Sequence, residues 1–248
     1  MGPWENPGVI VRDRPDDWQV VLQTDHADLS GSFARAWAEP GQRHDSLALA
    51  AQRHDDGWAV WERAPMVDRE NGKPVNFLDV GVPAHLAFYR ACIAAVSEQD
   101  PYSGLLVSMH GAGIYQQRYG RDPGLSVTQA EANRPLVDAF VAEQESGYPD
   151  RMARAGVEED ERWGDYELLQ LYDRLSLYFC MRDVEGGEEA ELQGYRLEPV
   201  GPWHIRMQPF PFGDEPATFS LVRRVFPKNG KGDVLALPPE RIEIVVDS

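Results

Sequence analysis

The residues best suited to chemistry in this chain are the neighbours His54 and Asp55, in the segment SLALAAQRHDDGWAVW that spans residues 46–61. Alanine and leucine favour helices, and the apolar residues of this segment recur at spacings of three and four. We therefore expect one helix over residues 46–61, with His54 on its buried face and Asp55 rotated from it by only about 100°. An imidazole and a carboxylate that reach one point are good ligands for a divalent metal. Taken alone, the motif is better explained as a helix end with an exposed Asp-Asp-Gly and a core histidine.

Three further histidines fall on the buried faces of predicted helices. His26 begins the apolar stripe of the first helix, where a histidine is expected to be neutral, the form that binds a metal. His85 lies on the stripe of the helix predicted for residues 83–98, and His110 on that of residues 102–120. Considered singly, His85 and His110 are better explained as core histidines with backbone partners.

Asp173 lies in the middle of the apolar face of the helix predicted for residues 160–181. An unpaired buried carboxylate costs several kcal/mol, so this side chain needs a partner. The partner could be an arginine, a backbone cap or a metal.

Two cations are candidates for binding an anionic substrate. Lys73 lies in residues 63–82, a stretch of about twenty residues without periodicity, and loops of more than about 12–15 residues are often functional lids. Arg118 follows His110 by eight residues on the same face of its predicted helix. Simple exposure to solvent is the better explanation of each one taken alone.

Composition and charge limit the partners of the chain. Its 248 residues suit one sizeable domain, or one domain with a small appendage. The 24 basic and 41 acidic residues give a net charge of −17, which repels nucleic acids and anionic membrane surfaces. Two cysteines form no disulfide framework, and the sequence shows neither a signal peptide nor a long apolar run. We expect a soluble cytoplasmic protein, with its oligomeric state left open.

The element patterns predict a mainly helical protein with strands at both ends. Short strands are expected at residues 9–12 and 18–22, and a further helix at residues 126–155. Residues 184–194 form a polar linker, after which short strands recur. This predicts a small β appendage that packs on the helices.

The order of these residues has a counterpart in a known superfamily. His26, the His54-Asp55 tandem and Asp173, each on the buried stripe of a different helix, resemble the H…HD…D signature of the HD-domain superfamily of metal-dependent phosphohydrolases. The two intervening histidines resemble those that supply a second metal in its dinuclear branch, which includes cyclic-nucleotide phosphodiesterases and mixed-valent di-iron oxygenases. Locally, QTDHADLSG, HDDGW, SMHG and LYDRLSLYFC look like the motifs of an uncharacterised bacterial family whose domain has no known function.

The resemblance implies a fold and a ligand set. The fold is mainly α, an HD-domain-like helical bundle over residues 1–184 with short N-terminal strands. The β-rich appendage over residues 185–248, predicted from the strand patterns, departs from the resemblance because the minimal HD fold lacks it. The implied ligands are His26, His54, Asp55 and Asp173 for a first metal ion, and Asp55, His85 and His110 for a second. Asp56 would orient the ligands beside the catalytic Asp55. One or two divalent ions are expected per chain, Fe or Mn before Zn, Co or Ni.

Three functions are compatible with such a site. The favoured one is a metal-dependent phosphohydrolase or phosphodiesterase, which uses a metal-activated hydroxide on a small phosphorylated metabolite or nucleotide. It requires no organic cofactor, and the sequence shows no nucleotide- or flavin-binding loop. The alternatives are a mixed-valent di-iron oxygenase on the same scaffold, and a non-catalytic metal- or ligand-binding regulator that docks partners through the β appendage.

Overall fold

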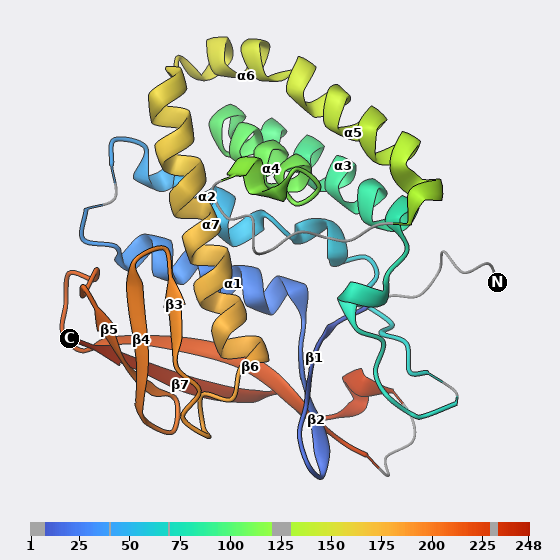
Figure 1. Cartoon of the computed structure of the whole chain (residues 1–248), viewed down its shortest axis with the longest axis vertical. Coiled ribbons are helices and arrows are strands. Elements are labelled where there is room, and N and C mark those ends of the chain that lie inside the picture. Colours follow the sequence, from blue (N-terminus) through green and yellow to red (C-terminus); the bar gives the residue numbers. More distant parts are fainter. Residues whose placement is uncertain (1–7, 40, 69, 121–129, 229–232) are drawn as a thin grey trace.

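The computed structural model describes residues 8–39, 41–68, 70–120, 130–228 and 233–248. Within these residues the helices lie on one side of a curved sheet (Figure 1). The long helix α7 runs from the outermost helices, α5 and α6, down to the sheet (Figure 1).

The sheet contains seven strands among the described residues, in the order β1-β2-β6-β7-β5-β4-β3. The strands are β1 (Ile10–Asp13), β2 (Asp17–Val21), β3 (Ala190–Leu192), β4 (Tyr195–Gly201), β5 (His204–Gln208), β6 (Ala217–Pro227) and β7 (Glu240–Asp247). β5 and β7 are parallel and the other neighbours antiparallel, so the sheet is mixed. The predicted mainly α bundle with a small β appendage is therefore wrong.

The error has a physical cause in the pairing of β2 with β6. Gln19 of β2 lies opposite Val225 of β6, so the N-terminal hairpin extends the C-terminal strands into a single sheet. Local patterns predict five of the seven described strands, β1, β2, β5, β6 and β7, but do not say which strands pair, because pairing joins residues far apart in the sequence. The segment predicted as a polar linker also ends in β3, which pairs with the unpredicted β4.

The helices cover the inner face of this sheet. They are α1 (Gln23–Ala36), α2 (His44–Arg53), α3 (Val82–Gln99), α4 (Pro101–Gly113), α5 (Arg134–Ser146), α6 (Tyr148–Ala155) and α7 (Glu159–Met181). The helix predicted for residues 126–155 is two helices in its described part, α5 and α6, and residues 126–129 lie outside the described residues. No helix in the described ranges is both long and apolar enough to span a membrane.

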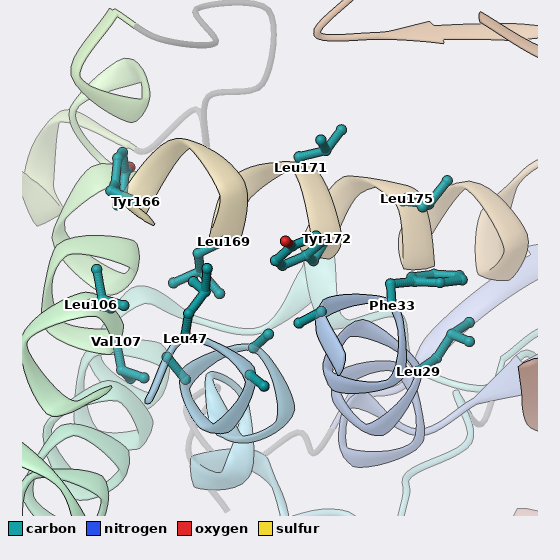
Figure 2. Packing of buried hydrophobic residues seen from close by; sticks show 14 of the residues in the cluster. Leu29, Phe33, Leu47, Leu106, Val107, Tyr166, Leu169, Leu171, Tyr172 and Leu175 are labelled. Atoms are coloured by element: carbon teal, nitrogen blue, oxygen red, sulfur yellow. The ribbon is translucent and has the colours of Figure 1, made fainter. Parts of the chain in front are cut away.

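α7 is the central helix of the core. Figure 2 shows Leu169 and Tyr172 directed from α7 towards the helices that carry Phe33 and Leu47, α1 and α2. α7 also packs on α4 and on strands β1 and β3. One helix therefore contacts both layers, and it is the helix that carries Asp173.

Phe33 joins the helical layer to the sheet. Its side chain is fully buried, and its ring centroid lies 4.6 Å from that of Phe219 on β6. On its other sides it meets the rings of Phe179 on α7, at 6.0 Å, and Phe212, at 6.1 Å. Such aromatic clusters bury large apolar areas, so α1 is held against both α7 and β6.

We expect Phe33→Ala to lower the free energy of unfolding by about 3–5 kcal/mol, because it opens a cavity between the two layers. Urea unfolding followed by circular dichroism measures this. Leu136→Ala on the exposed face of α5 is the control, and it should change stability by no more than about 0.5 kcal/mol. A loss below about 1 kcal/mol for Phe33→Ala would contradict the packing of α1 on the sheet.

Candidate metal centre

The chain leaves the α-helical path at the His54-Asp55 tandem. α2 ends at Arg53, His54 keeps helical angles (φ −59°, ψ −24°), and Asp55 departs from them (φ −114°, ψ 14°). Gly57 then packs so tightly on α3 that a β-carbon there would collide with the carbonyl of Phe88. The helix predicted to continue to residue 61 is therefore wrong. The turn brings both side chains of the tandem into the interior, where they are buried.

Four side chains from three helical regions meet at this point. His26 projects from α1, Asp173 from α7, and the tandem from the end of α2. His26 Nε2 lies 3.2 Å from His54 Nε2 and 3.2 Å from Asp173 Oδ1. Asp55 Oδ2 lies 3.7 Å from His26 Nε2 and 3.4 Å from His54 Nε2. The four implied ligands of the first ion are thus brought together.

The hydrogen bonds of the two imidazoles fix which nitrogen faces the cluster unprotonated. His54 Nδ1 lies 2.8 Å from the Ala51 carbonyl, which only accepts, so Nδ1 carries the proton. His26 Nδ1 lies 2.6 Å from Ser176 Oγ, whose own hydrogen is donated to the Asp173 carbonyl. His26 Nδ1 therefore donates too. In the neutral form, both rings present the Nε2 lone pair to the cluster.

The separations fit a single metal ion. Bonds of about 2.1 Å place ligand atoms about 3.4 Å apart in a tetrahedral site and about 3.0 Å apart in an octahedral one. His54 Nε2 and Asp173 Oδ1 are 3.6 Å apart, and the four separations given above run from 3.2 to 3.7 Å. The converging ligand atoms form two overlapping groups, one of His26, His54 and Asp173 and one of His54, Asp55 and His110. Nitrogen and oxygen donors of this kind suit divalent Fe, Mn, Co, Ni or Zn.

The pKa values of His54 and Asp173 also indicate that the cluster favours a positive charge. Burial lowers the pKa of His54, but the carboxylates of Asp55 and Asp173 outweigh it and raise that pKa to about 9. Burial raises the pKa of Asp173, yet the Arg118 guanidinium and the two histidines hold it well below its usual range. Without a metal ion, a proton on His54 supplies positive charge to the cluster.

His110 has the opposite tautomer. Arg118 donates a hydrogen bond to Gln170 Oε1, which turns the Gln170 amide nitrogen towards His110 Nδ1 at 3.2 Å. Nδ1 therefore accepts, and the ring proton sits on Nε2, which faces Tyr89 Oη at 3.5 Å. Burial and the neighbouring His54 hold the pKa of His110 well below its usual range. His110 still lies close enough to His54 and Asp55 to form a possible second ligand group.

His85 lines the same pocket at a greater distance from the cluster. Its Nδ1 is hydrogen-bonded to Tyr115 Oη, and burial lowers its pKa to about 4. Its ring lies 4.9 Å from that of Tyr89 and 5.5 Å from that of Trp58. The structure therefore brings His85 to the wall of the pocket, and among the described residues it belongs to neither group of converging ligand atoms.

A cavity of about 280 Å³ opens from the cluster to the surface. Arg118 lines it, as do Phe77, Leu78, Val80 and Val82 from the last part of the predicted lid. Lys73 is not among the lining residues, and its carbonyl accepts from the Asp68 amide. Asp56 is also outside the lining and is paired with Arg53. Of the three predicted auxiliary residues, Arg118 alone therefore reaches the cavity.

Several supporting residues were missed by the sequence interpretation. Gln170 and Ser176 stand three residues before and after Asp173, and both touch a histidine of the site. Tyr89 follows His85 by four residues and donates to Asp55 Oδ1 at 3.2 Å. Helical spacing from the predicted ligands would have found all three.

Glu62 is a further supporting residue that no sequence spacing indicates. Its carboxylate accepts from the backbone amides of Gln23 and Thr24, and from the Thr24 hydroxyl at 2.8 Å. Glu62 lies in the loop that follows the His54-Asp55 tandem, and it caps the N-terminus of α1, the helix that carries His26. Burial raises the pKa of Glu62 to about 7.

Fold and site together define a helix-on-sheet protein with a buried histidine–aspartate cluster. Residues 9–228 match the model of a family described as "Protein of unknown function (DUF3891)", and the chain belongs to this family. No curated protein and no solved structure matches the chain. The family description names no activity, so the resemblance to the HD-domain superfamily stays a prediction.

The raised pKa of His54 predicts how the stability of chelator-treated protein depends on pH. The pKa is about 9 in the folded chain, against 6.5 for an unperturbed histidine, so protonated His54 stabilises the fold fully below pH 6.5. This contribution is lost as pH rises through about 9. We expect the Tm of the chelated protein to fall across this range, measured by thermal unfolding.

The control for this measurement is His204→Ala, because His204 lies outside the site on β5 and pairs with Asp247. That variant should keep the fall in Tm, whereas His54→Gln should flatten it. An equal fall in wild type and His54→Gln would contradict the assignment.

Proposed function

We propose that this protein is a metal-dependent phosphohydrolase or phosphodiesterase that acts on a small phosphorylated metabolite or nucleotide. The observation that carries the proposal is the meeting of two imidazole nitrogens and two carboxylate oxygens inside the core. The second nitrogen of each ring is already used in a hydrogen bond. A proton would satisfy only one contact of this cluster, whereas a divalent cation can bind several of these donors at once.

The residues that would hold the ion are His26, His54, Asp55 and Asp173. When bound, a divalent ion lowers the pKa of a water molecule to near neutrality and neutralises phosphate oxygens. Fe and Mn fit the donor set first, and Zn, Co and Ni are compatible with it. The net charge of −17 opposes capture of an anion, so attraction has to come from groups within the pocket.

The other residues of the pocket supply charge and hydrogen bonds for a phosphate group. The Arg118 guanidinium, 3.2 Å from Asp173 Oδ2, is a fixed positive charge beside the cluster. Tyr89 keeps its hydroxyl proton, because burial raises its pKa well above the usual value. His110 offers the Nε2 proton as a second neutral donor. Arg118 and His110 can orient phosphate oxygens without changing their own protonation, while the Tyr89 hydroxyl donates its proton to Asp55 Oδ1.

A site with one ion requires the fewest changes to this arrangement. For His110 to bind a second ion through Nε2, its proton would have to move to Nδ1, and the Gln170 amide would have to turn round. Arg118 opposes that rotation, because it donates to Gln170 Oε1. The di-iron oxygenase needs the second ion, so this observation favours the hydrolase. We further propose a cytoplasmic location, since Cys92 and Cys180 are both free and buried.

Metal content is the first test. Protein purified without chelator should carry about one equivalent of Fe or Mn per chain by elemental analysis, and Asp173→Asn should bind it at least about tenfold more weakly. Asparagine keeps the size of the side chain and removes its charge. His204→Ala is the matched control and should keep its metal. Full metal content in both Asp173→Asn and His54→Ala would refute the ligand set.

Turnover is the second test. A panel of phosphomonoesters and of cyclic and linear phosphodiesters is incubated with Mn²⁺, Fe²⁺ or Co²⁺, and the released phosphate or phosphomonoester is measured. Wild type and His204→Ala should show metal-dependent release, and His54→Ala should lose at least about a hundredfold. If all substrates fail while reduced, iron-loaded protein consumes O₂ with a small organic substrate, the oxygenase replaces the hydrolase. Metal binding without either reaction leaves the regulator.

A further inference from the structure

The pocket changes from polar to apolar along its depth. On α7, Leu177 and Met181 follow Asp173 at intervals of four residues, and all three line the cavity. Next to α4, Ile114 follows His110 by four. Residues four apart share one face of a helix, so the wall one or two turns outward from the cluster is apolar.

Lining residues from other segments are apolar as well. Trp58 lines the cavity beside the tandem, and Leu78 and Val82 line it from the end of the loop of residues 63–82. Leu78 is 62% exposed although it lines the cavity, so it stands at the mouth. An exposed apolar side chain at the edge of a pocket is typical of a binding surface for an apolar group.

The charges of the pocket limit the head group that it can accept. The charged side chains that line the cavity among the described residues are Asp55, Asp173 and Arg118. One divalent ion would bring their sum to +1. A single phosphate group of charge −1 or −2 would nearly balance this positive charge. A triphosphate would leave a large uncompensated negative charge in a poorly solvated site, which is costly.

Arg118 is held at the inner end of the pocket by an unusual backbone. Gln117, Arg118 and Tyr119 have φ of 50°, 50° and 55°, in the left-handed region that non-glycine residues avoid. Such residues cost on the order of 1–3 kcal/mol each and persist where their surroundings hold them. Arg118 donates to Gln170 and pairs with Asp173, while its buried Nε has no hydrogen-bond partner in the described part of the chain.

From this arrangement, and resting on the proposed function, we infer that the substrate is a singly phosphorylated compound with an apolar body. The phosphate binds at Arg118 and the cluster, and the body lies between the α7 wall and Trp58, pointing towards Leu78. The cavity of about 280 Å³ is at the small end of ligand pockets, so the body is short. Nucleoside triphosphates are excluded as substrates.

The test is calorimetric binding of methyl-, butyl- and hexylphosphonate to the metal-loaded protein. These compounds keep the anionic head and cannot be hydrolysed. Affinity should rise by up to about fourfold for each methylene buried. Hexanol, which lacks the anionic head, should bind at least about tenfold more weakly than hexylphosphonate. Equal affinity for methyl- and hexylphosphonate, or for hexanol and hexylphosphonate, would overturn the inference.

Single substitutions test where the apolar body of the ligand binds. Leu78→Asp should reduce the affinity for hexylphosphonate at least about threefold and leave methylphosphonate unchanged, because only the longer chain reaches the mouth. Leu136→Asp is the matched control, as Leu136 is also exposed, at 48%, and lies on α5 outside the cavity lining. Unchanged affinity for hexylphosphonate in Leu78→Asp would overturn this placement.

The outcome is separable from that of the proposed reaction. Binding that grows with chain length, without turnover of any phosphoester, would refute the hydrolase and leave the ligand class standing. Turnover of polar phosphoesters, with no effect of chain length on binding, would support the hydrolase and refute the ligand class.

Discussion

The structure depends on one electrostatic problem, which is that two carboxylates and two imidazole nitrogens meet inside an apolar core. Like groups this close repel one another unless a positive charge lies among them. The neighbouring residues are arranged around this need. Arg118 offsets Asp173, Tyr89 donates to Asp55, and Ser176 and the Ala51 carbonyl orient the rings of His26 and His54. α1, the end of α2 and α7 each contribute side chains to this cluster, so the packing of these helices depends on it.

His26, His85, His110 and Asp173 could be predicted as candidate ligands from the sequence because each lies on a helix, where spacing of three and four residues defines a face. His26 and Asp173 were found in this way, and Ser176 and Gln170 could have been. The role of Glu62 could not, because it caps α1 from a loop whose path no periodicity describes. Lys73 was proposed from its charge and its place in a long loop, and it does not line the pocket.

The pairing of the strands was harder to predict than the faces of the helices. The positions of β1, β2, β5, β6 and β7 follow from alternating apolar residues, but the partner of each strand does not. β2 pairs with β6, although most of the chain separates the two strands in the sequence. This pairing joins the N-terminal hairpin and the C-terminal strands into a single sheet. Similarly, the end of α2 at Arg53 depends on the contact of Gly57 with the backbone of α3. These two features are decided by contacts between distant residues, which a local pattern does not contain.

The place of β7 in the sheet has a consequence for the assembly of the protein during translation. β7 is the fourth strand in spatial order but the last along the chain, and it pairs with β6 on one side and β5 on the other. A nascent chain therefore cannot close the sheet until residues 240–247 have left the ribosome. α1, which carries His26, packs on β6, the strand with which β7 pairs. Proteolytic loss of β7 would likewise divide the sheet through its middle, where loss of a terminal segment usually frays only an edge.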